Sequence, residues 1–156
     1  MPTDSQMESR NALIEEIMRQ YDLDEFGSLP LVPFERFFAD NFDEQSIAVN
    51  AGWKELPDLN GIRSELQRIA SLPEIGQIFV TIHECPEADD EEDFEIWPQA
   101  QDLVVTASAD SGAVQELFSV LKPDYCNEGW QYEGKESSRP VPKLASNERP
   151  YTIGWD

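Results

Sequence analysis

Residues 77–84 read Q-I-F-V-T-I-H-E, and this stretch is the clearest β-strand signal in the chain. Isoleucine, valine, threonine and phenylalanine fit a pleated, half-buried surface better than they fit a helix. A second strand is predicted at 103–108, which reads L-V-V-T-A-S. The acidic stretch 85–101 between them has no strand character. Two such strands joined by a loop predict a sheet as the centre of the fold.

Apolar residues at helical spacing predict three amphipathic helices, at 6–21, 58–71 and 111–121. Asp4 or Ser5 is expected to cap the first helix, because short polar side chains accept hydrogen bonds from free N–H groups at a helix start. Pro73 is expected to stop the second helix and Pro123 the third. Pro33 should open one or two further helical turns.

Two shorter strands are predicted at 46–50 and 151–155, and residues 123–150 are predicted to form a long C-terminal loop rich in Gly, Pro and Ser. The chain has 156 residues, which suits one domain spanning 1–156. After the first helix the element order is β-α-β-β-α-β, the order of the ferredoxin-like arrangement. The sequence therefore predicts an α+β fold in which an N-terminal helix precedes a sheet with helices on one face.

The charge of the chain is strongly negative, with 11 Lys and Arg against 32 Asp and Glu, a formal net charge of −21. Residues 69–121 contain twelve of these acids and no Lys or Arg. Such a chain repels nucleic acid and anionic membranes, whose phosphates attract basic proteins. It favours a basic protein partner.

No apolar run approaches the roughly 20 residues that a membrane span needs. The first ten residues are polar and lack the apolar segment of a secretory signal. The two cysteines, Cys85 and Cys126, do not amount to a disulfide framework. A cytoplasmic chain with two free thiols is the expectation.

The acidic loop, residues 85–101, is the strongest candidate site. Eight of the twelve residues in 84–95 are acids. Runs of like charge stay solvated and often bind partners, so the loop is either an interface or a disordered, solvated connection. It lacks the alternating ligands and central Gly of a calcium-binding EF-hand loop. The partner-binding residues predicted here are Glu87, Asp89, Asp90, Glu91, Glu92, Asp93, Glu95, Trp97 and Trp53.

The four tryptophans at positions 53, 97, 130 and 155 have two interpretations. Trp dominates the binding energy of many interfaces, so Trp53 and Trp97, with acids nearby, are plausible anchors. Large aromatic rings also cover the edge of a core. The sequence leaves both interpretations open.

His83, Glu84 and Cys85 are adjacent, and His83 is the single histidine. One histidine and one thiol could begin a zinc site, but structural zinc needs four ligands in spacings that are absent here. A Cys–His nucleophilic pair is conceivable, yet no helix-opening segment accompanies it. The motifs of nucleotide-binding, serine-hydrolase and zinc-protease sites are missing as well. We predict no catalytic site, no metal and no cofactor.

The stretches L-V-P-F-E-R-F-F (31–38), P-D-Y-C-N-E-G-W (123–130) and Y-T-I-G-W-D (151–156) accompany this acidic composition. Together they resemble short bacterial proteins of the toxin-immunity type. The resemblance implies stoichiometric inhibition, in which an acidic surface blocks the basic active site of a nuclease.

The leading prediction is an acidic protein-binding module, most concretely an immunity protein that inhibits a cationic toxin such as a nuclease. The alternative is an acidic accessory or regulatory domain that binds a small molecule or a non-toxin protein. A thiol or metal enzyme using His83 and Cys85 is a third reading.

Overall fold

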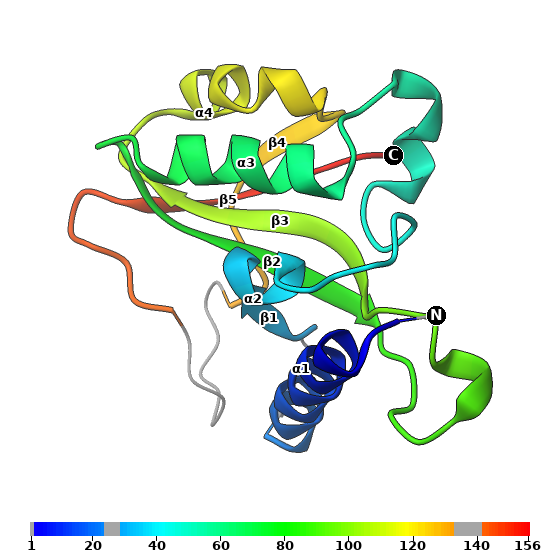
Figure 1. Cartoon of the computed structure of the whole chain (residues 1–156). Helices are drawn as coiled ribbons and strands as arrows, with labels where there is room; N and C mark the ends of the chain where they lie inside the picture. Colours follow the sequence, from blue (N-terminus) through cyan, green and yellow to red (C-terminus); the bar gives the residue numbers. More distant parts are fainter. Residues whose placement is uncertain (1, 24–28, 133–141) are drawn as a thin grey trace.

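The computed structural model describes residues 2–23, 29–132 and 142–156. They form an α+β fold around a five-stranded antiparallel sheet with the strand order β1-β2-β3-β5-β4 (Figure 1). The strands are β1 (Leu31–Pro33), β2 (Ile75–Glu84), β3 (Gln99–Ala107), β4 (Tyr125–Glu128) and β5 (Arg149–Gly154). The α-helices are α1 (Asp4–Asp22), α2 (Phe34–Phe38), α3 (Leu59–Ala70) and α4 (Ser111–Leu117). Three 3₁₀ helices are η1 (Val49–Lys54), η2 (Glu91–Asp93) and η3 (Ser119–Leu121).

The helices begin where polar side chains can accept their free N–H groups. Thr3, not Asp4 or Ser5, caps α1: its hydroxyl accepts from Gln6 N at 3.1 Å, and the Gln6 side chain accepts from Thr3 N at 2.8 Å. Asp58 caps α3 and Asp110 caps α4, each by one carboxylate hydrogen bond of 2.8 Å. The helix predictions at 6–21 and 58–71 and the short helix expected after Pro33 are confirmed within a few residues, and 111–121 divides into α4 and η3.

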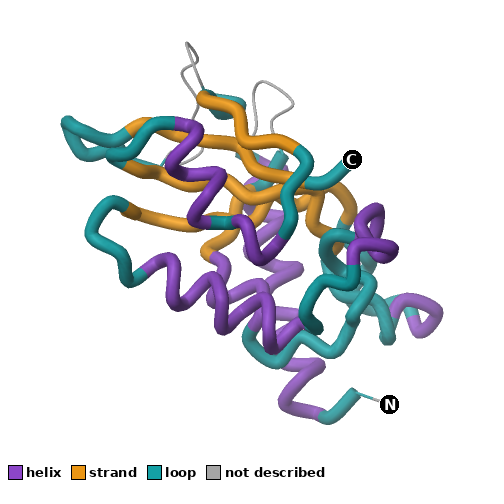
Figure 2. The backbone as a smooth tube through the Cα atoms, turned by 90° about the horizontal axis from the view of Figure 1, so that it is seen from above, coloured by secondary structure: helices purple, strands orange, loops and turns teal. Residues whose placement is uncertain are grey.

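Helices α3 and α4 lie on one face of the sheet, and the main core fills the space between (Figures 1 and 2). That core contains Ile62, Leu66 and Ile69 from α3. Helix α1 takes a different position beside the edge strand β1. Gln20 bonds the free edge of β1, donating to Leu31 O at 2.8 Å and accepting from Leu31 N at 3.0 Å. This cover protects an edge that would otherwise be open to another strand.

The antiparallel sheet agrees with the predicted α+β class, but the ferredoxin-like arrangement is not confirmed, because the strand order differs. The predicted strand 46–50 does not form: Ala48 adopts φ 55° and ψ 31°, and η1 starts at Val49. Two alternating apolar residues were too weak a pattern to hold an extended strand. Without this strand the first predicted βαβ unit cannot exist.

Two strands lie where none was predicted. Strand β1 has only three residues, which is too few for a period-two pattern. Strand β4 lies inside the predicted loop 123–150, and residues 133–141 of that loop are outside the described residues. Both are short edge strands, so their pairing partners rather than their own residues determine them. None of the helices in the described ranges has the length and hydrophobicity needed to cross a membrane.

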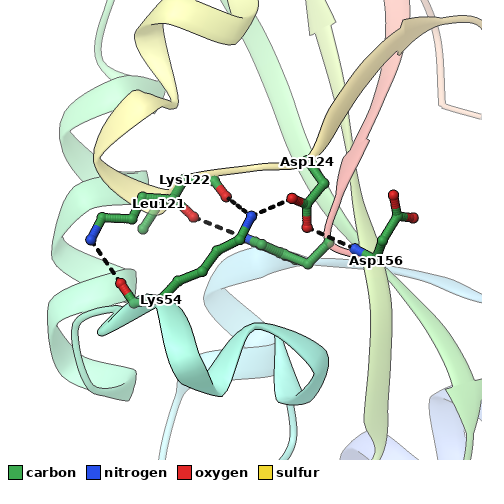
Figure 3. A network of polar contacts seen from close by, with 6 residues as sticks. Lys54, Leu121, Lys122, Asp124 and Asp156 are labelled. Carbon is green, nitrogen blue, oxygen red and sulfur yellow. Dashed lines mark hydrogen bonds and ion pairs between the residues drawn. The ribbon is translucent and has the colours of Figure 1, made fainter.

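A polar network joins η1 to the segment before β4 and to the C-terminus (Figure 3). Lys54 Nζ donates to Lys122 O at 2.9 Å and forms an ion pair with Asp124, while Lys122 Nζ donates to Lys54 O at 2.7 Å. The second oxygen of Asp124 accepts from Asp156 N at 2.8 Å. Nearby, Trp155 Nε1 donates to Leu121 O at 2.8 Å. These bonds connect the last strand, the edge strand β4 and η1.

Candidate functional site

The acidic loop 85–101 has a defined conformation because Arg10 of α1 lies inside it. The Arg10 side chain is 0% exposed. Its guanidinium donates to Ile96 O at 2.8 Å, to Asp93 O at 2.7 Å and to Glu87 O at 3.4 Å. A guanidinium carries five donors in a rigid plane, so it can hold several carbonyls at once. The phenyl ring of Phe94 lies 6.0 Å from the guanidinium carbon.

Two carboxylates of the loop accept hydrogen bonds from the loop's own backbone. Asp93 accepts from Glu87 N at 3.1 Å, and Asp90 accepts from Glu92 N at 3.0 Å at the start of η2. Burial lowers the pKa of Arg10, and the neighbouring charge of Asp93 opposes that shift. In this structure the Arg10 guanidinium and the carboxylates of Asp90 and Asp93 hold the backbone of the loop by hydrogen bonds.

Most acidic side chains of the loop are exposed to solvent. Arg10 bonds carbonyl groups, so the loop carboxylates keep their negative charge unpaired. Among the described residues, none of the exposed loop acids forms an ion pair. The exposed acids are Glu87, Asp89, Asp90, Glu91, Glu92 and Glu95, whereas Asp93 is partly buried.

A cleft of about 420 Å³ opens between this loop and the adjoining ends of β2 and β3. Asp43 is held at its wall, where it accepts from Trp97 N at 3.2 Å and from the Gln99 side chain at 3.1 Å. Carboxylates and apolar surface both line the cleft: Asp43, Glu84, Asp93 and Glu95, together with Cys85, Pro86 and Ile96. This combination suits a lysine or arginine side chain, which has an aliphatic stem and a charged head.

Trp97 belongs to the core. Its side chain is 0% exposed and packs edge-to-face against Phe42, with ring centroids 5.5 Å apart. A residue without exposed surface provides no contact area to a partner, which corrects the expectation of a surface anchor at Trp97. The Trp53 backbone lies in η1, but its side chain is outside what the structure describes.

The other two tryptophans also pack inward. Trp155 is buried, and Trp130 packs edge-to-face against Tyr132, with ring centroids 5.3 Å apart. For Trp97 and Trp155 the core interpretation holds.

The pair His83 and Cys85 lacks an activated thiol. Burial raises the pKa of Cys85 to about 11, and the positive charge of Arg10 offsets only part of this effect. At neutral pH the thiol is therefore protonated, and a protonated thiol is a poor nucleophile and a poor metal ligand. Within the described ranges, no group of three or more His, Cys, Asp and Glu is placed to hold a metal ion.

Alkylation of Cys85 by iodoacetamide should accordingly be slow at pH 7 and should rise about tenfold per pH unit through pH 10. An ordinary thiol would instead level off near its pKa of about 8.5. The modified peptide can be quantified by mass spectrometry after short exposures, with Cys126→Ala removing the second thiol. A rate that is already fast at pH 7, or that levels off below pH 9, would contradict the buried, protonated thiol.

Arg10 and Asp43 are the site residues that sequence reasoning missed. A usable signal was present for Arg10, because it precedes Leu13 and Ile17 on the apolar face of α1. A charged residue at a core position of an amphipathic helix indicates a buried polar partner. No signal in the sequence marked Asp43, which lies far along the chain from the loop it supports.

Comparison with known proteins gives a family and no activity. No curated protein and no solved structure is significantly similar to the chain. The model of one family, described as the uncharacterised protein YfbO family, matches residues 8–153. This match includes most of α1 with Arg10, the acidic loop, strands β1 to β4 and all of β5 except Gly154. The chain therefore belongs to the YfbO family.

Proposed function

We propose that the protein is an acidic binding module whose partner is a basic protein, and that the acidic loop is its contact surface. The observation that carries this proposal is the ordered loop built on Arg10, which presents six exposed carboxylates. A preformed surface loses less conformational entropy on binding than a mobile loop does. Its concentrated charge would speed the approach of a basic partner.

The cleft beside the loop supplies specificity. A basic side chain of the partner would place its stem along Pro86 and Ile96 and its charge near Glu95 and Asp93. In this proposal the protein binds its partner without catalysing a reaction. The most specific form of the proposal is an immunity protein that inhibits a cationic toxin, such as a nuclease, by covering its phosphate-binding surface.

The test compares two variants that carry the same change in net charge. In the loop variant five exposed acids become amides: Glu87, Asp89, Glu91, Glu92 and Glu95. Asp90 and Asp93 are left unchanged because they hold the loop backbone. In the control variant five exposed acids outside the loop become amides: Glu8, Glu15, Asp22, Glu55 and Glu116.

Each protein serves as bait in the native host extract, and the association rate of the retained partner is then measured at two salt concentrations. We expect a basic partner whose retention falls at least tenfold with the loop variant and stays near wild type with the control. Its association rate should drop with salt, because exposed charges are screened over about 8–10 Å. Equal losses with both variants would mean that net charge alone acts, and the loop would not be the interface.

A further inference from the structure

The 3₁₀ helix η1 begins and ends at residues with a left-handed backbone. Ala48 before it has φ 55° and ψ 31°, and Glu55 after it has φ 57° and ψ 49°. In this region the Cβ atom of any residue other than glycine comes too close to the backbone, which costs free energy. Such conformations persist only where the surrounding structure enforces them, and they are frequent in segments that switch. The backbone is therefore strained at both ends of η1.

The same conformation recurs at the residue to which η1 is bonded. Lys122 has φ 49° and ψ 51°. In the described ranges four residues other than glycine have a positive φ, and they are Asp40, Ala48, Glu55 and Lys122. Three of these four lie at the two ends of η1 or at its bonding partner. The left-handed residues are therefore concentrated around one contact.

Lys54, the last residue of η1, makes that contact (Figure 3). Its Nζ donates to Lys122 O at 2.9 Å and forms an ion pair with Asp124, and Lys122 Nζ donates to Lys54 O at 2.7 Å. The Lys54 side chain is only 10% exposed and the Asp124 side chain 27%. Salt screens a partly buried pair less than a surface pair, so this contact holds η1 firmly at ordinary ionic strength.

Two clefts of about 280 Å³ each meet at η1. The first lies between η1 and the adjoining ends of β2 and β3, and its lining includes His83 and Tyr125. The second lies between η1 and the start of α3, and its lining includes Leu59. Ala48 and Val49 line both clefts. The start of η1 is therefore the partition between them.

The described side chains of η1 provide little other anchorage. Ala51 is buried in the core, but Val49 is 55% exposed. A Cβ atom at Gly52 would meet no heavy atom within 4 Å. Small and exposed side chains contribute little packing energy, so the bonds of Lys54 are the strongest described contact of the segment.

We propose that η1 is a hinged flap, with Ala48 and Glu55 as hinges and the bonds of Lys54 to Lys122 and Asp124 as the latch that holds it closed. Release of the latch relieves the strain at both hinges, and the outward movement of η1 joins the two clefts. A cavity of their combined size falls within the range of small-molecule sites, so the flap controls access to such a cavity. No residue of the acidic loop takes part, and the flap does not depend on the protein-binding proposal.

Hydrogen exchange at the Ala51 amide measures the opening of the flap. This amide is buried and donates to Ala48 O at 2.9 Å, so it exchanges only when η1 moves. Lys54→Met keeps an aliphatic side chain of similar length and removes the ammonium group. We expect Ala51 to exchange at least tenfold faster in this variant, whereas the amides of the central strand β3 change much less.

Arg68→Met is the matched control, because it also removes a cation from an ion pair, the pair of Arg68 with Glu65 on α3. Arg68 is exposed, and exposed pairs contribute little to stability. The Ala51 amide should exchange at the wild-type rate in this variant.

Ala48→Gly and Glu55→Gly test the hinges. Glycine adopts the left-handed conformation without the steric cost, so each change should stabilise the closed flap. We expect Ala51 exchange to slow about two- to fivefold in each variant. Each change should also offset part of the acceleration when it is combined with Lys54→Met.

The latch would be overturned by wild-type exchange at Ala51 in Lys54→Met. It would also be overturned if Ala51 and the β3 amides accelerated by the same factor, because Lys54 would then support the whole fold and not the flap. Unchanged or faster Ala51 exchange in both glycine variants would show that the hinges store no strain.

Discussion

Arg10→Met should lower the free energy of unfolding by about 1–3 kcal/mol, the cost typical of leaving buried hydrogen-bonding groups without a partner. Methionine fills a similar space but cannot donate to Ile96 O, Asp93 O or Glu87 O. These carbonyls would stay buried without partners, or the loop would open to reach water. Urea unfolding measures the loss, and faster hydrogen exchange at the Ile96 amide would report the opening of the loop.

Arg19→Met is the matched control, because Arg19 lies in the same helix but is exposed and forms ion pairs with Glu15 and Glu16 at the surface. Exposed ion pairs of this kind contribute little to stability. The unfolding midpoint of this variant should stay close to wild type. If Arg10→Met unfolded at the wild-type midpoint, or if both variants lost the same stability, Arg10 would not hold the loop.

Trp97→Ala should cost about 3–5 kcal/mol, because removing a fully buried tryptophan loses its transfer free energy and leaves a cavity. The edge-to-face contact with Phe42 would be lost as well. Trp97→Phe should cost less, since Trp97 Nε1 has no hydrogen-bond partner among the described residues. Chemical denaturation of the three proteins gives the comparison.

The control for this prediction is Ile96→Ala, which removes the neighbouring side chain at a position that is partly exposed. Its effect on stability should be small. A Trp97→Ala protein as stable as Ile96→Ala would show that the tryptophan lies at the surface, and would restore it as an interface candidate.

The helices and strands that could be predicted are those whose own residues show a periodic apolar pattern. The strand centred on 77–84 and the helices α1 and α3 show their own periodicity, because each buries a face of its own side chains. Strands β1 and β4 show none, because edge strands of three and four residues depend on the neighbour that pairs with them. The strand predicted at 46–50 was wrong for the opposite reason. Its residues alternate, but in the described ranges the segment has no neighbouring strand with which to pair.

In the candidate site, too, some features were visible in the sequence and others depend on tertiary contacts. Charge adds along a chain, so the sequence by itself determined the acidic loop and its base-free surroundings, from which a basic partner is predicted. The tertiary structure alone decided that Arg10 orders this loop and that Trp97 is core, since both depend on contacts between residues more than 50 positions apart. It alone joined Lys54 of η1 to Lys122 and Asp124, which precede β4. Strand pairing and packing bring distant residues together, and no local pattern records which of them will meet.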